Sequence, residues 1–257
     1  YADINTLYGL SGISGLGNEA VTISDETSAV NINGILSKTS GVVTATVTSD
    51  TAASLNSALT NTTGNDALTL TVTGTAAATD LTALDGKTSV NVGATAVTTI
   101  TGTQAQVVAI NVGTITTSGN YAVTLSGISS ASDVNTIVND TTGIVTATVT
   151  EATAASLNSA LANASSTDAL TLTLTDTALA SADDLIALDG KTSVTVNAGS
   201  VTSVTDTYAD INTLYGLSGI SGLGNEAVTI SDTTSAANVN GILSKTSGVV
   251  TATVTSD

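Results

Sequence analysis

Short segments of the chain alternate strictly between apolar and polar positions. In residues 43–48 the polar position is always threonine (Thr44, Thr46 and Thr48), and residues 68–73 follow the same pattern with Leu, Leu and Val between three threonines. A period of two residues predicts a β-strand whose two faces differ in polarity. These strands should therefore bury one apolar face and present one threonine face.

Each alternating segment is followed by a segment with helical spacing. After Asp50, apolar residues at Ala52, Leu55, Ala58 and Leu59 recur at the period of a short amphipathic helix. Asp50 is expected to cap the N-terminus of this helix, and two aspartates hold the same place in their own segments: Asp25 and Asp232. Glycines with positive φ are expected just after the helices: Gly41, Gly64, Gly86, Gly143 and Gly190. One repeat thus consists of a strand, a short helix and a glycine turn.

Longer repeats are superimposed on this short one. Tyr1–Asp50 recurs 207 positions later as Tyr208–Asp257, with differences only at Glu26, Val30 and Ile32. A weaker half-period relates Gly41 to Gly143, 102 positions on. We therefore expect one continuous array over residues 1–257: a full long period (1–207), half-periods at about 20–121 and 122–226, and the start of the next long period (208–257).

A strand and a helix of this length cannot bury their apolar faces alone, whereas stacked repeats can. The predicted fold is an α/β right-handed solenoid of strand–short helix repeats, with one continuous parallel sheet and an architecture like that of leucine-rich repeats. Two longer segments, 89–120 and 193–225, should each contain an extra short strand. We also expect the 257 residues to belong to a longer repetitive polypeptide, or to form a filament subunit.

Composition excludes several classes of function. The net charge is −17, the only cations are four lysines, and the chain has no histidine, cysteine or arginine. It therefore lacks the basic surface that binds nucleic acid and the side chains of zinc sites, catalytic triads and thiol nucleophiles. Its apolar runs are too short to insert into a membrane. No enzymatic activity is expected.

The threonine face is the most distinctive predicted surface. We expect Thr44, Thr46 and Thr48 to lie beside Thr69, Thr71 and Thr73. Equivalent threonines in the second half-period continue the pattern: Thr146, Thr148, Thr150, Thr171, Thr173 and Thr175. Threonine is a good polar strand former and can simply fill a solvent-facing surface. The alternative is that this array binds carbohydrate, ice or another surface.

Acidic residues are the second candidate site, because Ca²⁺ prefers six to eight oxygen ligands. The weak candidates are Asp25, Asp140, Asp183 and Asp184. Neither the EF-hand loop nor the calcium-binding nonapeptide repeat occurs, and most acids occupy cap and turn positions. We expect no resident cofactor and keep Ca²⁺ as an alternative.

The segments VTATVTSDTAASLNSAL (from Val43) and VTATVTEATAASLNSAL (from Val145) resemble the Asp-Thr-Ala-Ala-type repeats of very large bacterial surface proteins. These are haemolysin-like, S-layer-like and fibrillar adhesin proteins of cyanobacterial type. The resemblance implies export and a structural or adhesive role at the cell surface or in a secreted matrix. The expected partners are further copies of the chain, end to end or laterally, and cell-surface polysaccharide.

Overall fold

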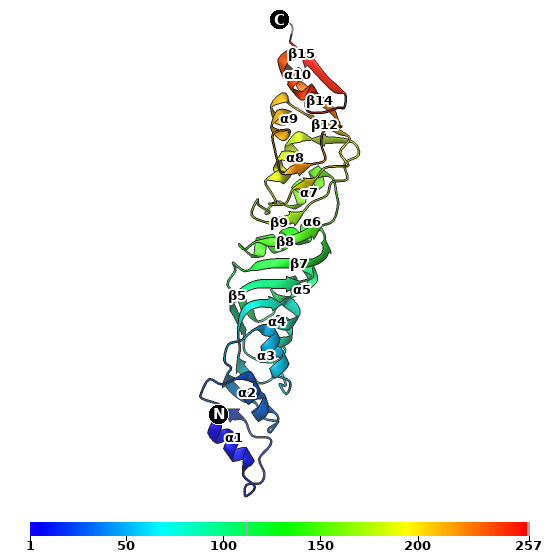
Figure 1. The fold of residues 1–257 in the computed structure, drawn as a ribbon. Helices are drawn as coiled ribbons and strands as arrows, with labels where there is room; N and C mark the ends of the chain where they lie inside the picture. The colour runs from blue at the N-terminus through cyan, green and yellow to red at the C-terminus, as the bar shows by residue number, and fades with distance from the viewer. Residues whose placement is uncertain (112, 256–257) are drawn as a thin grey trace. The chain divides into compact units, whose positions relative to one another are not determined.

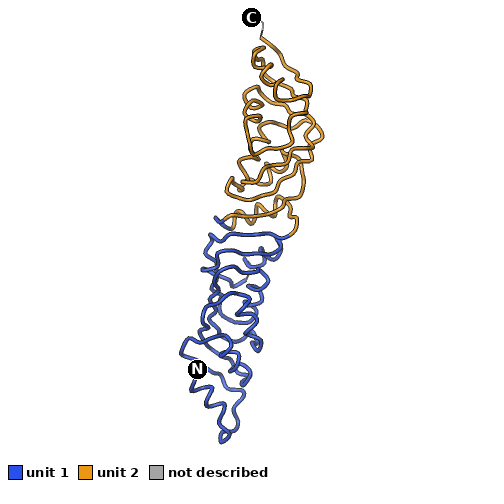
Figure 2. The backbone as a smooth tube through the Cα atoms, viewed as in Figure 1, with its two compact units in different colours: residues 1–126, 141–143 blue, residues 127–140, 144–257 orange. Residues whose placement is uncertain are grey.

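The computed structural model describes residues 1–111 and 113–255. They form two compact units, one of residues 1–126 and 141–143 and the other of residues 127–140 and 144–257 (Figure 2). Among the described residues there are ten helices and fifteen strands, and each helix is followed by one or two strands (Figure 1). The chain is therefore an α/β protein, as the alternation of periods predicts.

The first unit contains five short helices, α1 (Ala2–Gly9), α2 (Ala29–Leu36), α3 (Ala52–Ala58), α4 (Ala78–Asp85) and α5 (Gln104–Ile110). Its strands are β1 (Val21–Thr22), β2 (Val43–Thr46), β3 (Ala67–Thr69), β4 (Thr71–Ala77), β5 (Val92–Gly102), β6 (Ile115–Thr117) and the first part of β7 (Ala122–Ser129). One sheet has the order β1-β2-β3. In the other, β4, β5 and β7 are neighbours and β6 pairs with β5.

The second unit repeats this plan with α6 (Ala131–Asp140), α7 (Ala154–Ala160), α8 (Ala182–Asp189), α9 (Tyr208–Leu214) and α10 (Ala236–Leu243). Its strands are β8 (Val145–Val149), β9 (Ala169–Thr171), β10 (Leu179–Ser181), β11 (Val196–Asn197), β12 (Ser203–Asp206), β13 (Ile220–Ser221), β14 (Ala227–Thr234) and β15 (Val250–Val254). β8 pairs with β9, β10-β12-β14-β15 form a four-stranded sheet, and β11 pairs with β13.

Every strand pair described within either unit is parallel, and the partners are separated by a nearly constant length of chain. Val21 pairs with Val43, 22 positions on, and Thr46 pairs with Thr69, 23 positions on. In the second unit Ser203 pairs with Ala227, 24 positions on. Each repeat therefore returns the chain beside its starting point after one strand, one helix and their connections.

Burial follows the predicted alternation. In β2 the side chains of Val43 and Ala45 are buried and those of Thr44 and Thr46 are exposed. On α3, Leu55 is buried, as are Ala52 and, just past the helix, Leu59. The core of each unit thus lies between the apolar face of its strands and the apolar stripe of its helices.

The helix caps differ from the prediction. The N-cap of α3 is Thr51, whose hydroxyl accepts the N–H of Ser54 at 3.2 Å, while the Asp50 carboxylate accepts the N–H of Thr51 at 2.7 Å. Ser28 and Ser235 cap α2 and α10 in the same way, in place of the expected aspartates. A hydroxyl reaches the first-turn N–H groups from directly before the helix, whereas Asp50 lies one residue too early.

Of the five glycines expected to have positive φ, only Gly64 does (77°). Gly41 and Gly143 are required for another reason, which is close approach of two backbones. A Cβ on Gly41 would lie 2.2 Å from the carbonyl oxygen of Glu19, and one on Gly143 would lie 2.3 Å from that of Tyr121. Glycine at these positions therefore allows one repeat to pack tightly on the previous one.

The expected single continuous sheet is wrong, because the hydrogen-bond ladder is broken into several sheets. In places a single bridge replaces the ladder, as between Thr27 and Val47 and between Asp50 and Val72. The β4–β5 pair shifts register twice, the second time after Gly74, which has a φ of 75°. Such irregularities leave residues unpaired and end a regular ladder.

The two longer segments each contain the expected extra strand. β6 pairs with β5 through Val92 and Ile115, and β13 pairs with β11 through Val196 and Ile220. None of the helices within residues 1–111 and 113–255 has the length and apolar character needed to cross a bilayer.

Candidate functional site

The threonine face is exposed in both units. Of the twelve predicted threonines, ten are exposed, and Thr73 and Thr173 are half-buried. The buried neighbours along the same strands, Val43 and Val145 among them, point into the core. The strands thus present methyl and hydroxyl groups to solvent, as the alternation predicts.

The predicted alignment of these threonines is wrong by two residues, which is one period of the alternation. Thr46, and not Thr44, lies beside Thr69, and Thr44 lies beside Ala67. The second unit has the same register, with Thr148 beside Thr171. The reason is that paired residues of these strands lie 23 positions apart, whereas the predicted alignment needs an offset of 25.

Threonine pairs also occur where the prediction placed none. Thr205, Thr229 and Thr251 form a row across β12, β14 and β15. In the first unit Thr22 pairs with Thr44, and Thr75 with Thr99. The hydroxyl array is therefore made of short rows of two or three threonines within each unit.

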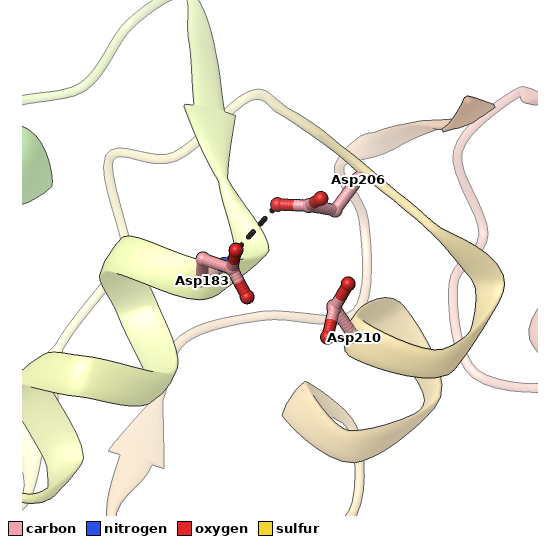
Figure 3. Close-up of side chains that lie close together, drawn as sticks. All are labelled: Asp183, Asp206 and Asp210. Atoms are coloured by element: carbon pink, nitrogen blue, oxygen red, sulfur yellow. Dashed lines mark hydrogen bonds between the residues drawn. The ribbon is translucent and has the colours of Figure 1, made fainter. Parts of the chain in front are cut away.

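Three aspartates of the second unit bring their carboxylates together. Asp183 lies in the first turn of α8, Asp206 ends β12 and Asp210 lies in the first turn of α9, with one oxygen of each within 4.8 Å of the others (Figure 3). Asp183 is exposed, and the other two are half-buried. The prediction named Asp183 but missed Asp206 and Asp210. These two residues are brought close to Asp183 by the pairing of β10 with β12, in which paired residues lie 24 positions apart.

Hydrogen bonds hold two of these carboxylates in place. Asp206 accepts the hydroxyl of Ser181 at 2.9 Å, the N–H of Asp183 at 3.3 Å and the N–H of Thr207 at 3.1 Å. Asp210 accepts the hydroxyl of Thr207, the N-cap of α9. Both acids therefore have structural roles at helix N-termini, where the helix dipole favours negative charge.

The charges of Asp206 and then Asp210 raise the pKa of Asp183 above its ordinary value of 3.8. Like charges this close disfavour the ionised form of the exposed partner. A divalent cation held by the three carboxylates would remove this repulsion, and carboxylate oxygens are the ligands that Ca²⁺ prefers. The chemistry open to this cluster is thus binding of a hard cation.

The other calcium candidates are not members of this cluster. Asp184 accepts the side-chain amide of Asn158 at 2.8 Å. Asp25 accepts the amino group of Tyr1, which lowers the pKa of its carboxyl. Asp140 is the exposed last residue of α6. Among the described residues, Asp183 is the only one of the four candidates that belongs to a group of three or more acids.

Buried carboxylates form a second polar feature that the sequence prediction missed. Asp66 is 1% exposed and accepts the N–H of Val43 at 2.9 Å and that of Thr63 at 3.0 Å. Asp168 makes the equivalent bonds to Val145 and Ser165, both at 3.0 Å. The available signal was an acid followed by Ala, an apolar residue and Thr at the start of a strand.

Two further acids follow this pattern with a tyrosine as partner. Glu19 accepts the hydroxyl of Tyr8 and the N–H of Gly17, and this bonding lowers its pKa to about 2. Glu226 accepts the hydroxyl of Tyr215 in the same way, and burial raises the pKa of that tyrosine. Hydrogen bonds of this kind favour the charged carboxylate.

Comparison of the chain with models of known protein families, with curated proteins and with solved structures finds no match.

Proposed function

We propose that the chain is a non-enzymatic structural segment of an extracellular repeat protein, which builds a fibre or a surface layer on a bacterial cell. The nearly constant spacing of the parallel strand pairs carries the proposal. Partners lie 22 positions apart at Val21 and Val43 and 24 apart at Ser203 and Ala227, with one short helix between them. This spacing is what a right-handed solenoid of stacked strand–helix repeats requires.

Bonds between successive repeats support the same reading. Thr88 and Thr192 are buried, and each hydroxyl bonds the backbone of the strand before it, at Leu68 and Leu170 respectively. The two Leu-Asp-Gly-Lys turns each contribute a lysine that donates to a carbonyl group at the end of the helix one repeat earlier. Lys87 donates to Leu59, after α3, and Lys191 donates to Leu161, after α7. Bonds of the same kind between equivalent residues of the two units suit a scaffold that grows by adding repeats.

One surface groove, beside α4 and α5, has no ionisable side chain in its lining. It has a volume of about 310 Å³ and is lined by Thr79, Thr82, Ala105, Gln106 and Ala109. Such a lining offers no acid, base or nucleophile with a perturbed pKa, which active sites require.

Electron microscopy of the purified chain tests the structural proposal. Rods or fibres are expected, whereas compact monodisperse particles would contradict it. A control chain carrying Leu55→Asp and Leu157→Asp puts a charge at the buried face of α3 and α7 and should lose these forms. Labelling of the protein on intact cells tests the extracellular location.

A second candidate function is adhesion through the threonine face, because its methyl and hydroxyl groups are exposed in regular strands. Replacing Thr46 and Thr71 with lysine should abolish adhesion to polysaccharide, ice or other surfaces while the fold persists, since both side chains are exposed. A chain with Thr79→Lys and Thr82→Lys on α4 is the matched control, because it adds the same two charges at exposed positions away from the strands. Adhesion that survives the Thr46 and Thr71 changes rejects this candidate.

A further inference from the structure

The two copies of the duplicated sequence, Tyr1–Asp50 and Tyr208–Asp257, differ in how much of their apolar surface is covered. Leu7 on α1 is 39% exposed, whereas its counterpart Leu214 on α9 is 1% exposed. Ile4 is half-buried, whereas its counterpart Ile211 is fully buried. The three positions at which the copies differ, 26, 30 and 32, do not include these residues.

The uncovered surface of the first copy is a groove. It has a volume of about 260 Å³ and is lined chiefly by Ile4, Leu7, Tyr8, Leu16 and Val21. Val21 belongs to β1, the edge strand of the sheet β1-β2-β3, so a strand edge borders the groove. Apolar side chains beside an open strand edge are typical of a surface that receives a further strand.

In the second copy a defined segment covers the equivalent surface. β12 pairs with β14 in parallel, with Val204 beside Val228, the counterpart of Val21, and both side chains are fully buried. The helix α8 of the same segment contacts α9, and its residues Leu185 and Leu188 are buried. The covering segment is thus Leu179–Asp206, which contains the helix α8 and the strands β10, β11 and β12.

The glycine loop beside the groove has the same backbone conformation in both copies. Gly15 and Gly222 have φ values of 88° and 89°, and the next glycine of each loop is at 131° and 126°. The carboxylate below the loop accepts the N–H of Gly17 at 2.7 Å in one copy and that of Gly224 at 2.6 Å in the other. A loop that already has its covered conformation lowers the cost of binding a partner.

We propose that this groove is the docking site for a segment with a sequence like that of Leu179–Asp206. This segment would precede Tyr1 in the polypeptide, just as Leu179–Asp206 precedes Tyr208. An apolar strand residue in the place of Val204 would pair beside Val21, and two helix leucines would cover α1. The inference rests on the proposed structural function. It adds which kind of repeat binds the groove beside α1 and β1, and in which order the repeats follow one another.

A cysteine placed in the groove tests the proposal, since the chain has no other cysteine. Residues 176–207 are added directly before Tyr1 of the full chain, which reproduces the natural junction between Thr207 and Tyr208. In this extended chain Leu7→Cys should react with a thiol reagent at least about tenfold more slowly than in the unextended chain. Its rate should approach that of Leu214→Cys, the covered counterpart.

The matched control is the same extension with Leu185→Asp, Leu188→Asp and Val204→Asp in the added segment alone. Equal slowing by both extensions, or no slowing by either, would overturn the proposal. If dilution of the unextended chain speeds the reaction of Leu7→Cys while the extension leaves it unchanged, a second copy occupies the groove and the proposed partner is wrong. The thiol reaction reports on this groove alone, so a negative result would reject the docking site without rejecting the proposed fibre. Conversely, an absence of fibres would not change the reaction rate of Leu7→Cys.

Discussion

The hydroxyl of Thr192 bonds both backbone groups of Leu170, which lies 22 positions earlier. It donates to the carbonyl oxygen at 2.7 Å and accepts the N–H at 2.9 Å, and Thr192 is only 5% exposed. Thr88 and Leu68 make the same pair of bonds in the first unit, at 2.8 and 3.0 Å. One buried side chain therefore joins two successive repeats where the strand begins.

Replacing Thr192 with valine should destabilise this junction by about 1–3 kcal/mol, because the backbone groups of Leu170 lose a buried partner while the shape is kept. Thr192→Ser keeps the hydroxyl and should cost less. Hydrogen exchange at the Leu170 amide measures the effect locally, which suits an array whose parts can open separately. Equal exchange in the two variants would contradict this role for the hydroxyl.

Replacing either of two glycines in one repeat with alanine should change the stability of the protein in opposite directions. Gly41→Ala places a Cβ 2.2 Å from the Glu19 carbonyl oxygen and should destabilise the protein by about 1–3 kcal/mol. Gly34 lies within α2 with open space around it, so Gly34→Ala should stabilise by about 0.5–1 kcal/mol. Urea unfolding of both variants measures the difference, and a shift in the same direction would contradict the packing described.

Acid should weaken the loop that contains Glu19. Its pKa is lowered from 4.5 to about 2, chiefly by the Tyr8 hydroxyl, so its stabilising effect is complete above 4.5 and is lost as the pH falls toward 2. Tyr8→Phe should raise this pKa toward the ordinary value. An NMR titration of the Glu19 carboxyl checks both statements, and an unchanged titration in Tyr8→Phe would refute the stated cause.

The cluster of Asp183, Asp206 and Asp210 predicts a charge effect of the opposite sign. Because the pKa of Asp183 is raised, the penalty it carries is absent below the ordinary pKa of 3.8, grows above it and is complete above the raised pKa. Asp183→Asn should therefore raise thermal stability at neutral pH without divalent ions.

Added Ca²⁺ separates repulsion from cation binding at this cluster. If the three carboxylates hold the ion, Ca²⁺ raises the melting temperature of the natural chain more than that of Asp183→Asn. Glu151→Gln, at an exposed acid of the same unit, is the control. An equal response of all three chains to Ca²⁺ would show that the cluster does not bind it.

Local patterns were sufficient to predict the elements. The alternation at Val43–Thr46 and the helical spacing of Ala52 and Leu55 both correspond to observed strands and helices with the expected faces buried. These signals are local, because a strand or a helix needs only one apolar face to be recognised. The same reasoning could not place the ends of the ladders, which depend on bulges such as the one near Gly74.

The candidate sites depend on contacts between repeats, which composition and periodicity do not specify. A two-residue error in the repeat length placed Thr44 beside Thr69, where the structure has Thr46. Asp206 was not recognised as a neighbour of Asp183 because they meet only through the β10–β12 pairing. Buried Asp66 resembles an ordinary turn residue until its bond to Val43, 23 positions earlier, is seen.

Small-angle X-ray scattering of the dilute full chain tests most directly whether the repeats stack into a solenoid. A compact protein of 257 residues has a radius of gyration of about 18 Å. Stacked repeats predict a clearly larger value and the scattering of an elongated particle. A radius close to that of a compact sphere would contradict the proposed architecture, and with it the role as a fibre or surface layer.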